Sequence, residues 1–155
     1  MATVLVVGSV NVDRIWHLAT PVRAGGRLTC TGRETRLGGG GFNTGAALLA
    51  LGHSVRLVAT LADDADGRAC HAALERRGFD MRHVGLVAGR TEPLDILVEP
   101  SGERTIIAPV AAERRPLDVL PAAGVDLVYV NRRRVDPAAM ADLLLRLSIV
   151  AQLPL

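Results

Sequence analysis

Short apolar runs alternate with amphipathic segments along this chain. Such runs lie at Thr3–Gly8, Val55–Thr60, Asp126–Val130 and Ser148–Leu153. Runs of this length, rich in β-branched residues, are typical of strands in a parallel sheet whose faces are both covered. We therefore expect a strand at each of these ranges and predict that the runs at 3–8, 126–130 and 148–153 are buried.

Three segments between these runs carry the end signals of helices. A glycine follows the first two segments, and an aspartate followed by proline precedes the third. Glycine favours the position just past a helix, whereas aspartate and proline favour the N-cap and the first helical position. The aspartates at 63, 64 and 66 are N-cap candidates for the second segment. The expected helices cover about residues 43–51, 66–77 and 137–147.

Polar and apolar residues alternate in two other regions. Residues 27–36 alternate loosely, and Leu94–Glu99 alternate before a Pro-Ser-Gly turn that leads into Glu103–Ala108. This pattern predicts exposed antiparallel ribbon and a hairpin. The fold class expected from the whole pattern is α/β, with a mainly parallel sheet and a small β extension. Because the sequence stops on an apolar strand with no helix after it, we expect a cut inside a larger domain.

Composition narrows the classes of function. The 155 residues match one ordinary domain, and 49% hydrophobic with 22% charged residues excludes a disordered chain. All 18 basic residues are arginine, which excludes chemistry that depends on lysine, such as Schiff bases and the P-loop. The net charge of +2 and 3% aromatic residues give no reason to expect a nucleic-acid partner.

The same inventory bears on compartment and metals. Two cysteines and no secretory signal favour a reducing cytoplasm. The uncharged stretch Leu37–Val55 is rich in glycine and contains Asn43, His53 and Ser54, so we do not expect a membrane span or a membrane partner. The four scattered histidines show no metal-binding spacing, and we expect no metal site in this chain.

Asn11 and Asp13 follow the first strand, at the edge where parallel sheets bind ligands. Two residues apart in an extended segment, they face the same way. An amide and a carboxylate can hold the hydroxyls of a polyol, or both can bond local backbone in an Asx-turn. Both interpretations stay open. No GxGxxG pattern is present, which argues against a Rossmann-type nucleotide binder.

Three further segments could carry chemistry. Gly38–Gly41 with Asn43 opens a predicted helix, and ligand contact is favoured there over a flexible turn. Asn43 itself either caps that helix or points at the ligand. The aspartates of residues 61–67 suit helix capping better than metal binding. Asn131–Arg134 follow a strand and could bind phosphate, although a solvated basic loop is favoured.

In this order the motifs resemble the ribokinase-like (PfkB) family of carbohydrate kinases, and the resemblance covers nearly the whole chain. The resemblance implies a three-layer α/β sandwich with a mainly parallel sheet and a β-sheet lid, cut short at its C-terminus. The lid would comprise roughly residues 15–36 and 91–108 and would often form a dimer contact. The matching motifs are GSVNVD (8–13), GGGGFN (38–43), LADDADG (61–67), ERRGFD (75–80) and TEPLDILVEPSGERTI (91–106).

The resemblance also implies a function. It implies ATP-dependent phosphorylation of a sugar, with a divalent cation such as Mg²⁺, by a cytoplasmic homodimer. Residues 1–155 would be the N-terminal sugar-binding part of one domain, with Asn131 as a possible additional contact. The sugar would be held by Asn11, Asp13, Gly39, Gly40 and Asn43.

One expected element is absent from the sequence. The family's catalytic base is an aspartate in a GAGD-type motif of the C-terminal half, whose glycines form an anion hole. No such motif follows residue 110. We therefore expect no catalytic residue and no ATP site in these 155 residues, and we expect the chain alone to be inactive. The alternatives are a nucleoside kinase of the same family or a non-catalytic module for sugar binding or dimerisation.

Overall fold

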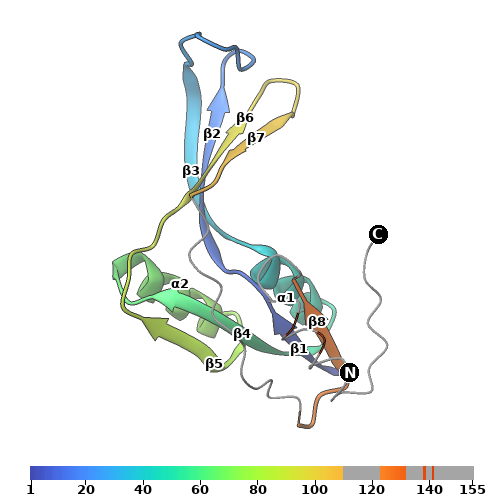
Figure 1. Ribbon diagram of the computed structural model, residues 1–155. Coiled ribbons are helices and arrows are strands. Elements are labelled where there is room, and N and C mark those ends of the chain that lie inside the picture. The colour runs from blue at the N-terminus through green and yellow to red at the C-terminus, as the bar shows by residue number, and fades with distance from the viewer. Residues whose placement is uncertain (110–122, 132–137, 139–140, 142–155) are drawn as a thin grey trace.

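The computed structural model of the protein describes residues 1–109, 123–131, 138 and 141. These residues form two four-stranded sheets, joined where the chain passes from one to the other (Figure 1). We call the lower sheet with its helices the body, and the projecting sheet the lid. The expected strand at 148–153 and nearly all of the expected helix at 137–147 lie outside the described residues.

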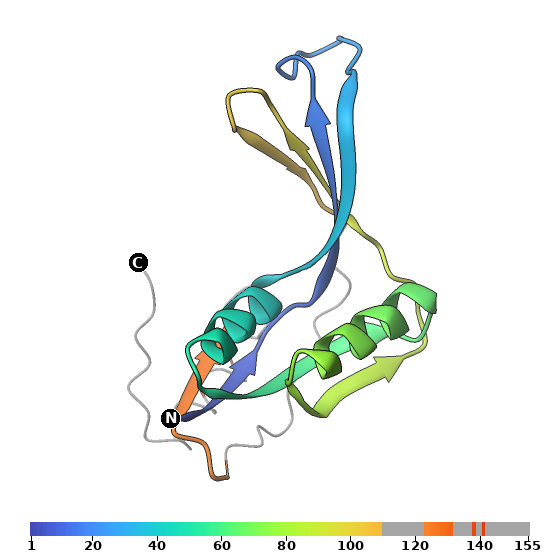
Figure 2. The ribbon, with the colours of Figure 1, turned by 180° about the vertical axis from the view of Figure 1, so that it is seen from behind.

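The body is a parallel sheet in the order β5-β4-β1-β8. Two helices, α1 (Gly40–Ala50) and α2 (Ala65–Arg76), lie on one face of it, as Figure 2 shows from behind. Within the described residues no helix covers the other face, so only part of the expected sandwich is visible. The strands are β1 (Thr3–Val7), β4 (Ser54–Ala62), β5 (Asp80–Val87) and β8 (Leu127–Val130).

Apolar burial holds the body together. Alternate residues of β1 point to opposite faces, and four of its five side chains are buried. Val4 and Val6 face the helices, where they join Val55 and Leu57 of β4 and Leu74 of α2 in one cluster. On the other face, Leu5 and Val7 pack with valines of β4 and β8. The apolar runs at 3–8 and 55–60 therefore form the two central strands.

The lid is a mixed sheet in the order β3-β2-β6-β7. β2 pairs antiparallel with β3 and parallel with β6, and β6 and β7 form the expected hairpin. Its strands alternate polar and apolar residues, which suits a sheet with exposed faces. The strands are β2 (Asn11–Leu18), β3 (Cys30–Gly38), β6 (Leu94–Val98) and β7 (Arg104–Ile107).

Three sequence expectations need correction. β5 was not predicted, because its polar residues Arg82 and His83 hide its period. It is an edge strand in which only Val84 is buried. β8 was predicted to be buried, yet Leu127 and Tyr129 are 48% and 37% exposed. They lie beside Val4 and Val6 on the helix side of the sheet, but the helices pack over β1, β4 and β5 and leave that edge open.

The third correction concerns the first helix. The sequence places its start near Asn43, whereas α1 begins at Gly40 with Gly39 as N-cap. Gly38 therefore ends β3, and Gly40 and Gly41 lie in the first turn of the helix rather than in a loop before it. None of the helices described here is long and apolar enough to cross a membrane.

Candidate functional site

The sequence-predicted residues Asn11 and Asp13 lie where the lid joins the body. β1 ends at Val7, and after three residues the chain enters β2, whose first residue is Asn11. These two residues are therefore at the root of a lid strand, at the carboxyl edge of the body sheet. Because strand residues two apart share a face, Asn11 and Asp13 point the same way. β2 begins at Asn11, whereas the lid segment expected from the sequence begins at roughly residue 15.

Ser9 fixes the glycine turn, Gly38–Gly41, beside this strand. The Ser9 carbonyl accepts hydrogen bonds from the amides of Gly41 (2.9 Å) and Phe42 (3.3 Å), and its hydroxyl accepts one from Gly40 (3.2 Å). The first amides of α1 therefore already have partners. The expected contact of a ligand with the glycine run stays a prediction. The sequence analysis missed Ser9, although it lies inside the GSVNVD motif.

Glycine is required in this turn for two reasons. Gly39 has φ of +97°, a backbone conformation that other residues rarely adopt. A Cβ on Gly41 would come within 2.7 Å of the Gly8 carbonyl carbon, so the helix can approach the end of β1 only without side chains. The run of glycines thus brings α1 against the strand end that carries Ser9, Asn11 and Asp13.

Asp13 has the most unusual environment in the site. Its Oδ1 atom is buried and has no hydrogen-bond partner among the described residues. Burial raises the pKa of its carboxyl group. A Cβ on Gly38, which pairs with Asn11 in the neighbouring strand and lies diagonally across from Asp13, would overlap the carboxylate. A buried acceptor without a partner costs free energy, and such groups in native proteins need an explanation, for which a polar ligand is one candidate.

Asn131 and Gly40 come together at the same edge. Asn131 follows β8, and its backbone amide donates to the Val7 carbonyl at 2.8 Å. A Cβ on Gly40 would overlap the side-chain nitrogen of Asn131, so these two sequence-predicted residues are in direct contact. Asn131 thus lies beside the glycine turn although it is distant in sequence. Arg132–Arg134, the candidate phosphate site, lie outside the described residues.

Asn43 does not cap its helix. It lies in the second turn of α1, its side chain is exposed, and the helix has no side-chain cap. Of the two readings of Asn43, the capping one is therefore wrong. Its expected contact with a ligand stays a prediction.

The aspartates at 63 and 64 have structural roles. Asp64 caps α2 by accepting from the Gly67 amide at 2.8 Å, which confirms the capping interpretation. Asp63 pairs with Arg68. Across the described part of the chain, no three His, Cys, Asp or Glu residues are grouped to hold a metal ion.

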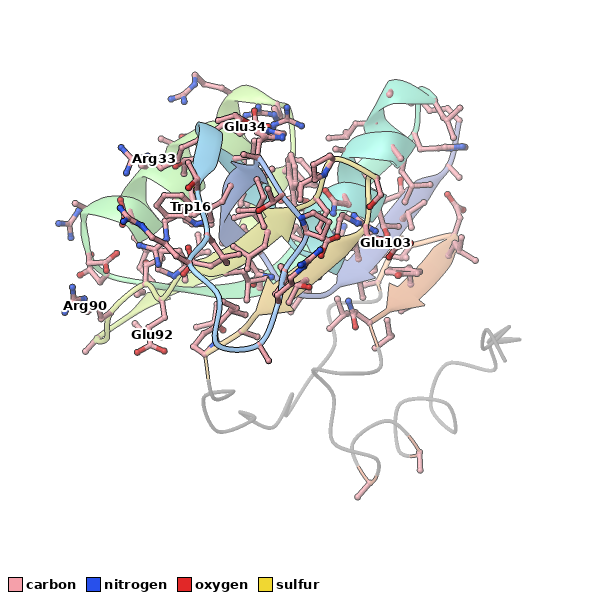
Figure 3. The ribbon with its side chains drawn as sticks, turned by 90° about the horizontal axis from the view of Figure 1, so that it is seen from above. Trp16, Arg33, Glu34, Arg90, Glu92 and Glu103 are labelled. Carbon is pink, nitrogen blue, oxygen red and sulfur yellow. The ribbon has the colours of Figure 1, made fainter. Side chains whose placement is uncertain are left out.

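Charged side chains cover both faces of the lid. On the face that carries Asp13, Glu34 accepts from Arg36 (2.9 Å) and His17 (3.3 Å). On the other face, Asp95 bonds Arg14 and Trp16, both at 2.7 Å. Figure 3 shows Trp16 near Arg33, whose guanidinium lies 5.4 Å from the centre of the indole ring. Arg36 lies directly opposite Asp13 in the strand register, on the same face of the lid as Asp13, and the sequence analysis missed it.

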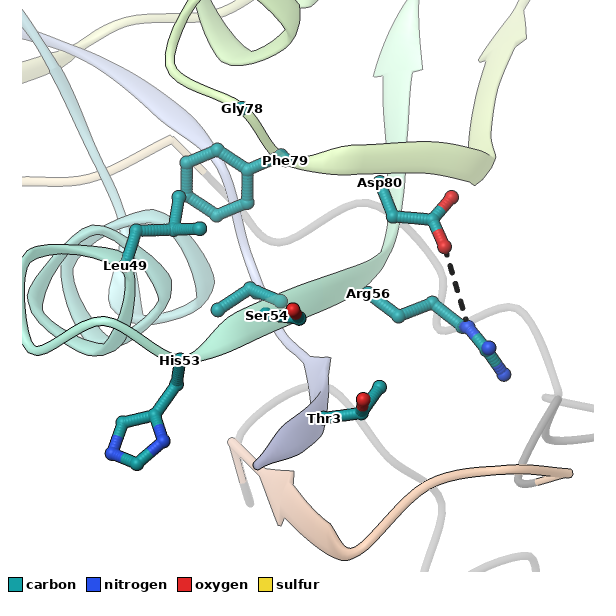
Figure 4. A pocket seen from close by; sticks show the side chains of 9 residues that line it. Thr3, Leu49, His53, Ser54, Arg56, Gly78, Phe79 and Asp80 are labelled. Atoms are coloured by element: carbon teal, nitrogen blue, oxygen red, sulfur yellow. Dashed lines mark hydrogen bonds and ion pairs between the residues drawn. The ribbon is translucent and has the colours of Figure 1, made fainter. Parts of the chain in front are cut away.

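A separate pocket of about 340 Å³ opens at the opposite edge of the body (Figure 4). It is lined by residues at the starts of strands, including Thr3, Ser54 and Asp80, and by His53. The Asp80 carboxylate reaches Arg56 at 3.4 Å and Arg82 at 2.6 Å, and the hydrogen bond from Arg82 is the main cause that lowers its pKa. Ligands of parallel sheets bind at the carboxyl edge, so we do not take this pocket as the functional site.

No family model matches the chain, but individual known proteins are similar to it. It is 28% identical over 106 residues to the ribokinase of Haemophilus influenzae, an alignment that covers 68% of this chain and 35% of that protein. It superposes on ribokinase from Cryptococcus neoformans var. grubii serotype A, solved in complex with ADP, with a TM-score of 0.78 and 28% identity. That match covers 99% of this chain and 48% of the solved chain.

Two further solved structures carry bound substrates. Arabidopsis thaliana ribokinase, complexed with ribose and ATP, has a TM-score of 0.57, 26% identity, and coverage of 68% of this chain and 35% of its own. Burkholderia thailandensis nucleoside kinase, in complex with inosine, has a TM-score of 0.61 and 19% identity, over 68% of this chain and 34% of its own. This chain therefore spans about half the length of one relative and about a third of the others.

Proposed function

Because the chain is a ribokinase-like (PfkB) protein that matches the N-terminal portion of its relatives, we propose that it is the sugar-binding part of an ATP-dependent carbohydrate kinase. The γ-phosphoryl group of ATP passes to a sugar hydroxyl, whose proton goes to a base, and ADP leaves. In this proposal residues 1–155 form the N-terminal part of one ribokinase-like domain. The two segments of the lid, 11–38 and 94–107, close over the sugar.

The buried, unpartnered Oδ1 of Asp13 is the observation that supports this proposal most directly. A sugar hydroxyl that donates to this oxygen removes the cost of leaving it unpaired, so this hydrogen bond lowers the free energy of the complex with a polyol. Asn11, on the same face, offers an amide that both donates and accepts. An amide and a carboxylate side by side suit adjacent hydroxyls of one sugar ring.

The glycine turn has a supporting role. With no side chains at Gly39 and Gly40, a sugar ring can approach the start of α1 closely. Asn131 lies against Gly40 and adds an amide at the same edge, and exposed Asn43 completes the proposed set. Closure of the lid excludes water, which would otherwise compete with the sugar hydroxyl for the phosphoryl group.

The proposal assigns ATP, Mg²⁺ and the catalytic base to the part of the relatives that this chain does not match. The Cryptococcus ribokinase was solved with ADP, and the Arabidopsis ribokinase with ribose and ATP. Within the described residues, the amides at the start of α1 bond Ser9, and no acidic cluster is grouped for a metal ion. We therefore propose that the 155-residue chain binds sugar and does not transfer phosphoryl groups. The complete reaction depends on the sugar site and on the site for ATP, Mg²⁺ and the base.

The lid also supports a proposed contact between two copies of the chain. Ile106 and Ile107 of β7 are each 55% exposed at the edge of the lid sheet. An exposed edge strand with apolar residues is a site for pairing with another chain. A homodimer through the lid is therefore part of the proposal, and the concentration dependence of the sedimentation coefficient measures it.

Calorimetric titration with ribose, fructose and inosine tests the proposed function. Asp13→Ala should weaken the binding of the preferred ligand roughly 10- to 100-fold, the usual range for losing a hydrogen bond to a charged group. Asp66→Ala, which removes an exposed aspartate in the first turn of α2, is the matched control and should leave binding unchanged. Preference for inosine over both sugars would indicate that the chain is part of a nucleoside kinase rather than a carbohydrate kinase.

Two results would contradict the proposal. Equal affinity of the parent and Asp13→Ala for every ligand would remove Asp13 from the site. Robust transfer of phosphate from ATP with Mg²⁺ by the 155-residue chain would show that the nucleotide site and the base lie within it. Binding without transfer is the expected outcome.

A further inference from the structure

Up to the end of β7 the chain crosses between body and lid three times; the return from β7 to β8 passes largely through residues outside those that the structure describes. The chain passes from β1 to β2 at residues 8–10, from β3 to α1 at Gly38–Gly39, and from β5 to β6 at residues 88–93. Figures 1 and 2 show the third crossing at a distance from the other two. The first two crossings are tied together at Ser9, which bonds the amides of Gly40, Gly41 and Phe42. They therefore act as one attachment point, and the third crossing is a second.

Among the residues that the structure describes, the carboxylate of Asp64 holds that third crossing to the body. Asp64 Oδ1 accepts from the Gly67 amide (2.8 Å) and from the Thr91 hydroxyl (2.7 Å). Its Oδ2 accepts from the Thr91 amide at 2.7 Å. Asp64 thus caps α2 with one bond and binds the crossing with two. Hydrogen bonds to an ionised acceptor are about twice as strong as neutral ones.

The lid backbone connects Thr91 to the candidate site, so a change in the position of Thr91 would affect the surroundings of Asp13. Thr91 lies three residues before Leu94, the first residue of β6. In the parallel pairing of β2 with β6, Leu94 is the partner of Asp13. A shift of the crossing therefore moves the strand that neighbours Asp13, whereas the body sheet shares no ladder with β6.

We propose that Asp64 is a positioning residue that fixes the orientation of the lid on the body through its two bonds to Thr91. Asp64 does not touch the sugar in this proposal; it acts through Thr91 and β6. Its effect on sugar affinity rests on the function proposed above, whereas its effect on the orientation of the lid does not. The hydrogen bonds from Thr91 are also the main cause that lowers the pKa of Asp64 to about 2, so the carboxylate stays ionised at neutral pH.

Two substitutions separate this role from helix capping. Asp64→Asn keeps an oxygen that can accept from Gly67, so α2 remains capped. Its NH₂ group replaces Oδ2 and faces the Thr91 amide, so that two donors oppose each other. Thr91→Val removes the hydroxyl at nearly constant shape and leaves the cap intact. Asp63→Asn is the matched control, because Asp63 carries the same charge, pairs with Arg68 and does not bond Thr91.

The experiment measures the distance between body and lid in the unliganded full chain. Spin labels are attached at Glu75→Cys on α2 and Arg104→Cys on β7, both exposed, in a Cys30→Ser background; Cys70 is buried. Asp64→Asn and Thr91→Val should broaden the distance distribution, and Asp63→Asn should leave it unchanged. Helical circular dichroism should be the same in all variants.

Titration of the same variants with ribose adds a second readout. Asp64→Asn should weaken binding about fivefold, because the apparent Kd rises as the fraction of molecules with a competent lid falls. A distance distribution for Asp64→Asn that matches that of Asp63→Asn would overturn the proposal, whatever the affinity. Broadened distributions in a chain that binds no sugar would uphold the role of Asp64 and reject the proposed function.

Discussion

The body and the lid are sheets of equal strand number that are stabilised in different ways. In the body, Val4, Leu5, Val6 and Leu57 are at most 1% exposed. In the lid, Leu18 and Gly38 are the buried residues of its four strands, and all of β7 is exposed. The body therefore has an apolar core of its own, and the lid does not.

Polar side-chain contacts, both between strands and within β3, replace that core in the lid. Asp95 bonds Arg14 and Trp16, and Glu34 bonds Arg36 and His17. Such contacts weaken with salt and acid, whereas apolar burial does not depend on charge. We therefore expect the orientation of the lid to change more readily than the fold of the body, and Asp13 lies at the boundary between the two.

The largest effect is expected from a cavity in the body. Leu57 is fully buried, so Leu57→Ala should lower the free energy of unfolding by about 2–5 kcal/mol. The matched lid variant, Ile106→Ala, removes a side chain that is 55% exposed and should change it by less than about 0.5 kcal/mol. Urea unfolding followed by circular dichroism measures both. Equal losses would contradict the contrast between the two sheets.

An intermediate effect is expected at the boundary. The new methyl group of Gly38→Ala would overlap the Asp13 carboxylate, so the variant should lose about 1–3 kcal/mol of stability and most of its sugar binding. Gly32→Ala, on the same strand, is the control. Its Cβ would lie 3.6 Å from the His17 ring, an ordinary contact, and both properties should be retained. Sugar binding by Gly38→Ala at the parental affinity would show that Asp13 does not need its present position.

The smallest effect is expected within the lid. The hydrogen bond from the Trp16 indole, followed by the hydrogen bond and the charge of Arg14, lowers the pKa of Asp95. A lowered pKa means that the stabilising contact is present above the ordinary aspartate range and is lost as the pH falls through the folded-state value. The emission of Trp16, the single tryptophan, should therefore titrate with a midpoint below that range.

Two controls sharpen this measurement. Asp95→Asn should abolish the transition in Trp16 emission while the circular dichroism of the body helices stays constant. Raising the salt concentration should shift the midpoint upward, because screening weakens the attraction of Arg14. A midpoint within or above the ordinary range would contradict the pairing of Asp95 with Trp16.

The sequence predicted most of the elements that surround the site. The run at Thr3–Gly8, the hairpin of β6 and β7, and the cap at Asp64 follow from neighbouring residues, and the structure confirms them. The sequence did not predict β5, because polar residues that are tolerated at a sheet edge hide its strand period. It also did not predict the start of α1. That helix begins early because Ser9, which is 31 residues from Gly40, accepts the bonds of its first amides.

What the sequence determined by itself is local: the strand and helix periods, the caps, and the order of motifs that resembles the ribokinase-like family. The tertiary structure decided which groups have partners. Asp13 is left with an unpaired buried oxygen, Asp64 finds Thr91 at a separation of 27 residues, and Asn131 lies against Gly40. Local periods depend on adjacent residues, whereas burial and hydrogen-bond partners depend on contacts between distant segments, which only the folded chain brings together.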